Sequence, residues 1–420
     1  MNMQPVTPKL IYKNNTLYFE NVEIKKIIER FSTPVYVYSK NQIIENFLNY
    51  KKALKQRNHI ICFAMKANSN LQILKIIKDL GGGCDVTSGG EIFRALNAGI
   101  EPRKIVYAGV GKTQQEIEYA LKNKILMLNI ESKDEVLLLE KIAKRKKIKI
   151  DISVRINPEV TTTTISYIST GEEGTKFGIP IKEAESFIKY VKNLKNLNLV
   201  GLHFHIGSQI CNVKPFVEAT KKVTELIKKM KLKLRYLDIG GGLGIRYKNE
   251  TPPTPEELMD ELLKHIPEDL TIICEPGRYI VGNAGILVSK VLYHKNVKNK
   301  KFLIIDASMT DLIRPAFYDA YHNIIPLNLN LINNSKIKKY EVAGPVCETS
   351  DFLGKNIRLP EISNGDYVVI ETTGAYGFVM SSNYNSRLKV AEVMVDDNKF
   401  YLIRKRDTYQ DLINKELKVS

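Results

Sequence analysis

The stretch IICFAMKANSNLQILKIIKDLGGGCDVT, residues 60–87, contains the pattern that decides the fold. A short apolar run at 60–66 is followed by a helical pattern over 71–80 and by a second apolar run at 83–87. A buried strand, a helix and another buried strand form the repeating unit of parallel α/β folds. The stretch therefore predicts a parallel sheet whose strands are joined by helices.

Six further apolar runs continue this alternation. They are KIVYAG (104–109), ILMLNI (125–130), KIDISVRI (149–156), LVGLHFHIG (199–207), LRYLDIGGG (234–242) and LTIICEPG (270–277). Eight strand–helix units over roughly 220 residues match a (β/α)8, TIM-like barrel in number and size. A doubly wound sheet is the alternative, but its glycine fingerprint does not follow the first strand.

The pattern changes after about residue 285, where strand-like runs separated by turn residues predict a second, mainly antiparallel β domain. These runs are ILVSKVLYH (286–294), KFLIID (301–306), DYVVIETT (366–373) and VAEVMV (390–395). LIYKNNTLYF (10–19) predicts a strand for the same domain, and LNLNLINN (327–334) predicts a surface loop or an edge. The expected domains are an N-terminal segment at 1–35 that joins the β domain, the barrel at 36–285 and the β domain at 286–420.

Composition excludes several classes of protein. The chain has 44% hydrophobic and 26% charged residues, which is ordinary for a soluble globular protein. It shows no apolar stretch long enough for a bilayer, and its N-terminus MNMQPVTPKL lacks the apolar segment of a signal peptide, so we expect a cytoplasmic protein without a membrane partner. The five cysteines form no CxxC pair, so neither a disulfide framework nor a zinc knuckle is expected. The net charge of +17 is spread along helix-like segments and no nucleic-acid module is present, so no nucleic-acid partner is expected.

The reactive groups of a barrel come from the C-terminal ends of its strands. Lys66 ends an apolar run, where an ammonium is costly unless it is paired or used, although such a lysine can also extend into water. Ser208 and the glycines at 240–242 suggest a phosphate site, although glycine turns also serve tight geometry alone. Glu275 and Arg278 of EPGR close the series.

His203 and His205 would point to the same side of one strand, which raises the possibility that they form a pair of metal ligands. The other histidines lie outside motif-like contexts and no carboxylate cluster completes a site, so no metal is expected. An imidazole packed flat on an aromatic cofactor explains one of the two, and we expect the other to be a satisfied core histidine. A lysine, a phosphate loop, a carboxylate and a histidine together indicate pyridoxal 5'-phosphate, because the amine can bond the aldehyde while the carboxylate keeps the pyridine nitrogen protonated.

The chain resembles the barrel-type, alanine-racemase-like pyridoxal-phosphate decarboxylases over nearly its whole length, and within them the branch that acts on diaminopimelate. The motifs that carry the resemblance are FAMKAN (63–68), CDVTSGGE (84–91), GVGKT (109–113), RINP (155–158), KFGI (176–179), HFHIGSQ (203–209), DIGGGLG (238–244), EPGR (275–278), CETSDFLG (347–354) and GAYG (374–377). Their number and order exceed what chance similarity gives.

The resemblance implies a role for each motif residue. Lys66 would hold the cofactor covalently, His205 would stack on its ring and Glu275 would meet the pyridine nitrogen. The remaining cofactor contacts would come from Ser208, Gly240, Gly241, Gly242, Gly277, Arg278 and Tyr376. The distal end of the substrate would meet Arg278, Arg314, Tyr318, Glu348 and Tyr376. Cys347 and Glu348 would enter from the second subunit of a homodimer with shared active sites. Cys347 would be the acid that protonates the carbanion. Without the resemblance, Cys347 would be interpreted as an ordinary buried thiol.

The chemical group at the distal end of the substrate distinguishes this branch from related decarboxylases that act on other substrates. A second amino-acid head calls for guanidinium groups and a carboxylate, which Arg278, Arg314 and Glu348 supply, although each arginine could instead pair with a surface carboxylate. We therefore expect a carboxy-lyase that converts meso-2,6-diaminopimelate to L-lysine and CO2, the last step of lysine biosynthesis. The alternatives are a decarboxylase of another basic amino acid or of carboxynorspermidine, or a catalytically inactive regulator on the same scaffold.

Overall fold

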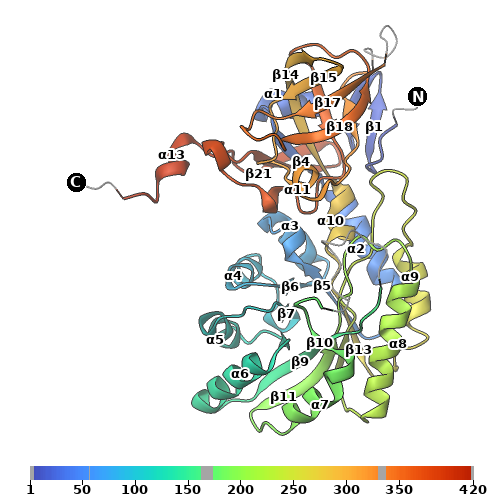
Figure 1. Cartoon of the computed structure of the whole chain (residues 1–420), viewed down its shortest axis with the longest axis vertical. Helices are drawn as coiled ribbons and strands as arrows, with labels where there is room; N and C mark the ends of the chain where they lie inside the picture. Colours follow the sequence, from blue (N-terminus) through green and yellow to red (C-terminus); the bar gives the residue numbers. More distant parts are fainter. Residues whose placement is uncertain (1–3, 56, 162–173, 330–336, 418–420) are drawn as a thin grey trace. The chain divides into compact units, whose positions relative to one another are not determined.

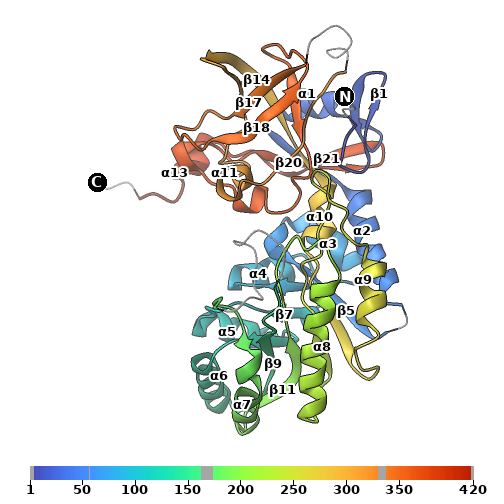
Figure 2. The same cartoon turned by 45° about the vertical axis from the view of Figure 1, so that its right-hand side comes forward.

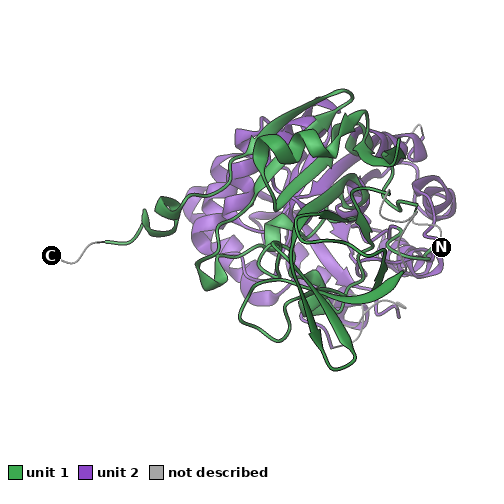
Figure 3. Cartoon of the chain, turned by 90° about the horizontal axis from the view of Figure 1, so that it is seen from above, with its two compact units in different colours: residues 1–43, 246–250, 281–420 green, residues 44–245, 251–280 purple. Residues whose placement is uncertain are grey.

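The computed structural model describes residues 4–55, 57–161, 174–329 and 337–417. The chain divides into two compact units (Figure 3). The β unit consists of residues 1–43, 246–250 and 281–420, and the barrel unit consists of residues 44–245 and 251–280. Among the described residues, every helix is too short or too polar to cross a lipid bilayer.

Within the described residues, eight parallel strands close into a barrel. In spatial order they are β5 (His59–Ala64), β6 (Gly83–Val86), β7 (Ile105–Tyr107), β8 (Met127–Ile130), β9 (Ile150–Asn157), β11 (Leu197–His203), β12 (Tyr236–Asp238) and β13 (Thr271–Cys274). The last strand pairs with the first, and β10 (Ile179–Pro180) adds to β9 outside this ring. All eight expected runs form these strands, so the prediction of a TIM-like barrel is confirmed.

Helices surround these strands (Figures 1 and 2). They are α3 (Leu71–Asp79), α4 (Gly89–Asn97), α5 (Gln114–Lys122), α6 (Lys133–Lys146), α7 (Ile181–Lys192), α8 (Lys214–Lys229) and α9 (Pro255–Leu262), with α2 (Lys40–Ala53) before the barrel and α10 (Arg278–Val281) after it. Side-chain caps fix where several of them begin: Ser88 accepts the N–H of Glu91, and Thr113 forms a capping box with Glu116. These caps set the lengths of the loops that follow the strands.

The β unit confirms the expected mainly antiparallel domain. Its main sheet has the order β18 (Phe352–Leu359), β17 (Lys338–Ala343), β15 (Lys300–Ile305), β14 (Gly285–Val297), β4 (Val35–Ser39), β20 (Ala391–Asp396) and β21 (Lys399–Arg404). Two more strands, β16 (Ile324–Pro326) and β19 (Tyr367–Ile370), pair with each other, and β19 also pairs with β14. The described part of this unit contains the short helices α1 (Ile24–Phe31), α11 (Arg314–Tyr318) and α13 (Tyr409–Ile413).

The expected strand at residues 10–19 is a hairpin. β1 (Leu10–Lys13), β2 (Thr16–Phe19) and β3 (Val22–Glu23) form a small sheet of their own, and Leu17 and Phe19 share an apolar core cluster with Val35 of β4. The expected loop or edge at 327–334 lies outside the described residues beyond position 329. Leu329 still donates its N–H to Asn15, at the turn of the hairpin.

Candidate active site

Lys66 lies just beyond the first barrel strand. β5 ends at Ala64 and Met65–Ala67 form a 3-10 turn, so the expectation that Lys66 ends the strand itself is off by two residues. Its Nζ donates a hydrogen bond to Asp85 Oδ2 at 2.6 Å; the lysine side chain is 36% exposed and Asp85 is fully buried. Burial raises the pKa of Asp85 to about 7, against the opposing charge of Lys66. The ammonium at the strand end is therefore paired.

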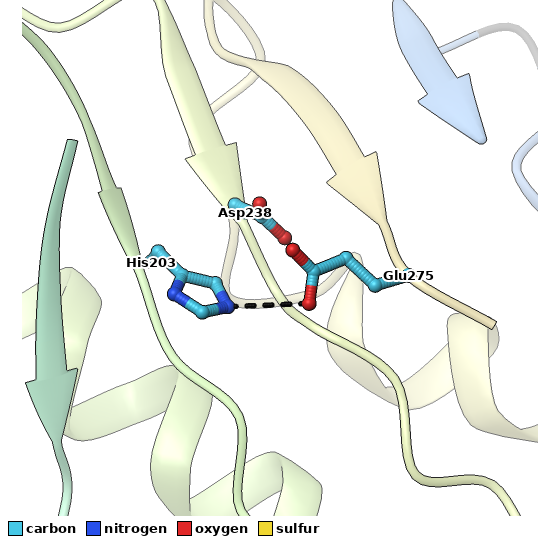
Figure 4. A group of neighbouring side chains, drawn as sticks. All are labelled: His203, Asp238 and Glu275. Atoms are coloured by element: carbon cyan, nitrogen blue, oxygen red, sulfur yellow. Dashed lines mark hydrogen bonds and ion pairs between the residues drawn. The ribbon is translucent and has the colours of Figure 1, made fainter. Parts of the chain in front are cut away.

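Glu275 follows the last strand, β13, and is almost completely buried. Its Oε2 lies 3.3 Å from Nε2 of His203 (Figure 4), and reactive atoms of His203, Asp238 and Glu275 all lie within 4.8 Å of one another. The expectation that no carboxylate cluster completes a site with the histidines is therefore wrong for His203. The cause is the parallel register, because β11, β12 and β13 are neighbours and bring their C-terminal ends together.

His205 has a different setting. β11 ends at His203, so the two histidines do not share one strand face as expected. Nδ1 of His205 accepts a hydrogen bond from the N–H of Gly241 at 3.1 Å, which requires that nitrogen to be unprotonated. Burial, with the charges of Lys66 and Arg155, holds the pKa of His205 well below its usual value. His205 is therefore neutral and its ring is fixed in orientation.

The glycine loop after β12 admits no side chains. Gly240 and Gly242 have φ angles of +63° and +114°, which L side chains rarely adopt. A Cβ on Gly241 would lie 2.1 Å from the carbonyl oxygen of Glu275. Such bare, closely packed backbone at strand ends can bring N–H groups to an anion.

Ser208, Arg278 and Gly277 also belong to the barrel unit. Arg278 donates from Nη2 and Nε to Ser208 Oγ at 2.9 and 3.2 Å. A Cβ on Gly277 would lie 3.0 Å from the Cβ of Ala64, so glycine here permits close approach to β5. These residues, Lys66, His205, Glu275 and the glycine loop all follow C-terminal ends of barrel strands.

A buried carboxylate that the sequence analysis missed links three loops of the barrel unit. Glu131, directly after β8, accepts the N–H of Gly109 at 3.1 Å and the N–H of Gly178 at 3.0 Å. Nη1 of Arg155 lies 3.1 and 3.2 Å from its two oxygens. A glutamate placed directly after the apolar run ILMLNI was the available signal, because such a position is buried and a charge there needs partners.

Arg314 is held within the β unit. Its Nη1 donates to Nε2 of His322 at 2.8 Å, and its guanidinium carbon lies 4.8 Å from the ring centre of Tyr247. Nδ1 of His322 lies 2.9 Å from the carbonyl oxygen of Glu371, so Nδ1 carries the proton and Nε2 is the acceptor. Arg314 is only 7% exposed, so this guanidinium is held inside the β unit.

The other candidates in the β unit are Tyr318, Cys347, Glu348 and Tyr376. Cys347 is exposed, so its interpretation as an ordinary buried thiol is wrong. Its N–H donates to Oδ1 of Asn385 at 3.0 Å, and Glu348 accepts a hydrogen bond from the hydroxyl of Tyr384. Tyr376 has a φ of +56° and Tyr318 is partly exposed at the end of α11.

The barrel unit fits pyridoxal 5'-phosphate by its own chemistry. Glu275 is buried, and its Oε1 receives no hydrogen bond from any donor in the described part of the chain, so it keeps acceptor capacity for a pyridine N–H. Lys66 offers a partly exposed amine, and the glycine loop offers bare backbone. The fold and these groups together define a barrel of the type that binds pyridoxal phosphate.

Comparison with known proteins agrees with a barrel that binds pyridoxal phosphate. Residues 40–282 match the family described as "Pyridoxal-dependent decarboxylase, pyridoxal binding domain". The chain is 44% identical over 425 residues to a diaminopimelate decarboxylase of Aquifex aeolicus, covering 99% of both chains. The chain belongs to the pyridoxal-phosphate-dependent decarboxylases, which are enzymes that release a carboxylate as CO2.

Solved structures of relatives give the same result. A diaminopimelate decarboxylase from Helicobacter pylori, complexed with L-lysine, has a TM-score of 0.89 and 45% identity, covering 94% of this chain and 99% of that chain. The corresponding enzyme from M. jannaschii, also with L-lysine, has a TM-score of 0.92 and 35% identity, covering 98% of each chain. The likeness therefore extends over both units.

Proposed function

We propose that this enzyme decarboxylates meso-2,6-diaminopimelate to L-lysine and CO2, the last step of lysine biosynthesis. The observation that carries the proposal is the 44% identity, over 99% of both chains, to a relative with that activity in its name. The lysine-bound structures of similar chains support a site that accommodates the product. The alternatives that experiment has to exclude are a decarboxylase of another basic amino acid or of carboxynorspermidine, and a catalytically inactive regulator on the same scaffold.

Pyridoxal phosphate supplies an electron sink for the charge that loss of CO2 leaves on the substrate carbon. In the proposed site Lys66 holds the cofactor, and Asp85 holds the lysine amine while it is not bonded. Glu275, whose pKa is held well below its usual value, would keep the pyridine nitrogen protonated, and neutral His205 would lie against the ring. The rest of the cofactor would be held by Ser208, the glycines at 240–242, Gly277, Arg278 and Tyr376. No metal takes part.

The proposed substrate site uses charges that match a second amino-acid head. Arg278 and Arg314 bind the distal carboxylate and Glu348 binds the distal ammonium, with Tyr318 and Tyr376 beside them. Cys347 protonates the carbon that lost CO2, and its exposure in the β unit supports a role at a surface that another chain covers. In this proposal Cys347 and Glu348 act in the active site of the partner subunit of a homodimer, and the enzyme works in the cytoplasm.

The test compares substrates on the purified holoenzyme. Release of CO2 and L-lysine from meso-diaminopimelate is expected, with ornithine and lysine at least 10⁴-fold lower in kcat/KM, because they leave the arginines without a carboxylate. Comparable turnover of ornithine would overturn the assignment, and absence of turnover with every substrate would favour the regulatory role. Borohydride reduction should fix the cofactor to Lys66, and Lys66→Ala should lose that adduct while it folds normally.

A further inference from the structure

Asp238 lies at the end of β12, beside Glu275, and its side chain is fully buried. Asp238 Oδ1 accepts the N–H of Gly240 at 3.0 Å. Within the described residues, no donor group reaches Asp238 Oδ2 or Glu275 Oε1. Figure 4 shows that the two carboxyl groups face each other. Two buried carboxylates in this arrangement cannot both be ionised without strong repulsion.

We propose that Asp238 is a neutral carboxylic acid whose O–H donates a hydrogen bond to Glu275 Oε1. Asp238 is then a positioning residue: it fixes the Glu275 carboxylate and, through Gly240, joins it to the glycine loop. Each carboxylate oxygen has two lone pairs, so Glu275 can accept this bond and still accept the N–H of a pyridine ring.

The surroundings decide which of the two acids keeps the proton. The opposite oxygen of Glu275 faces Nε2 of His203 at 3.3 Å. Burial opposes ionisation of Glu275, but His203 and Lys66 outweigh it and hold the pKa of Glu275 well below its usual value. For Asp238, burial and the charges of Glu275 and Asp85 outweigh the N–H of Gly240 and raise the pKa well above its usual value.

Other titratable groups also lie near Asp238. Besides Glu275 and Asp85, they include His203, whose ligand nitrogen lies within 4.8 Å of a carboxylate oxygen of Asp238, and the thiols of Cys62 and Cys274. Both thiols are buried and their pKa values are raised, so they are neutral and supply no positive charge. The neutral form of Asp238 is therefore the form that the barrel interior favours.

A neutral acid has a close isostere, which makes the proposal testable. In Asp238→Asn the amide oxygen can accept from Gly240 and the NH2 group can donate to Glu275, as the protonated acid does. Asp238→Leu has a similar shape but leaves both partners without a bond. Asp151→Asn is the control, because Asp151 is a partly exposed residue that pairs with Arg235 at the opposite end of a barrel strand.

The first measurement is the infrared spectrum of the cofactor-free protein. Wild type should show the carbonyl band of a protonated carboxylic acid at pH 8, and Asp238→Asn should lose it while Asp151→Asn and Asp85→Asn keep it. A spectrum of Asp238→Asn identical to wild type in this region would overturn the proposal. Because this readout does not involve the cofactor, it fails or succeeds independently of the role proposed for Glu275.

The second measurement is the dissociation constant for pyridoxal phosphate, by fluorescence titration. Asp238→Asn should stay within about threefold of wild type, whereas Asp238→Leu should bind about 10- to 100-fold more weakly, since two buried partners lose a bond. Equal weakening by both substitutions would mean that Asp238 acts as an anion and would refute the proposal. So would a stoichiometric metal ion in purified wild type that Asp238→Asn lacks, because the ion and not a proton would then join His203, Asp238 and Glu275. If Asp238→Leu fails to fold, the infrared band and the binding by Asp238→Asn still decide.

Discussion

Glu131→Gln should destabilise the barrel unit by about 3–5 kcal/mol, because it leaves a buried guanidinium without its charge partner. The side chains of Arg155 and Glu131 are only 7% and 2% exposed, so water cannot replace the lost charge. The amide also turns one acceptor into a donor, which faces the N–H of Gly109 or of Gly178. Urea unfolding of the cofactor-free protein, followed by circular dichroism, measures the change in the free energy of unfolding.

A surface pair provides the matched control. Glu118 contacts Arg145, and their side chains are 30% and 54% exposed, so Glu118→Gln should cost about 0–1 kcal/mol. The double variant Glu131→Gln/Arg155→Met should lose less than Glu131→Gln alone, since it removes the unpaired charge. If Glu131→Gln costs no more than the surface control, or if the double variant is worse than the single one, the reasoning about a buried ion pair is refuted.

Glu131→Gln should also change how the stability of the protein depends on pH. Burial would raise the pKa of Glu131, but Arg155 and the N–H of Gly178 outweigh it, so the pKa lies below the ordinary value. A carboxylate whose pKa is lowered on folding contributes stability above its ordinary pKa, and that contribution is lost as the pH falls through the folded value. Glu131→Gln should therefore lose less stability than wild type when the pH is lowered from 7 into the acidic range.

Three further outcomes are expected. Gly241→Ala should weaken the binding of pyridoxal phosphate at least tenfold in a fluorescence titration, because its Cβ would lie 2.1 Å from a carbonyl oxygen, whereas Gly111→Ala, with open space around it, should not. Arg314→Lys should raise KM for meso-diaminopimelate about 10- to 100-fold, with a smaller change in kcat. The reason is that a lysine cannot keep the hydrogen bond to His322 and also bind a carboxylate through two hydrogen bonds. An unchanged KM would contradict this. Lys66→Ala and Cys347→Ala chains, each inactive, should regain about a quarter of wild-type activity when they are dissociated and reassociated in equal amounts, since half the dimers then contain one intact site. A mixture as inactive as its parents would exclude a shared site.

The barrel could be predicted from the sequence because its strands are buried on both faces and read as apolar runs between helical patterns. Strand ends were less accessible to prediction: β5 ends at Ala64 and β11 at His203, both earlier than the apolar runs themselves. An apolar residue can be buried in the loop beyond a strand, so hydrophobicity alone does not mark the last ladder hydrogen bond. This is why the two histidines were placed on one strand face.

The carboxylates inside the barrel were harder to interpret. Asp85, Glu131 and Asp238 stand in or directly after apolar strands, and each is buried with a specific partner or neighbour. Their positions in the sequence could have marked them as buried acids, but the partners come from other strands: Lys66 for Asp85, Arg155 for Glu131. Only the closed arrangement of the strands brings these groups together, and local periodicity does not contain that information.

The β unit draws strands from both ends of the chain, and this has a consequence for biosynthesis. β4 lies between β14 and β20, yet it leaves the ribosome long before residue 285 of β14 and residue 391 of β20. All the barrel strands are synthesised after β4 and before β14. The barrel can therefore fold while β4, an apolar strand of the β unit, still has both edges unpaired. Translation that stops before residue 391 would leave β4 open along one edge, which makes the nascent chain a substrate for chaperones and a template for aggregation during synthesis.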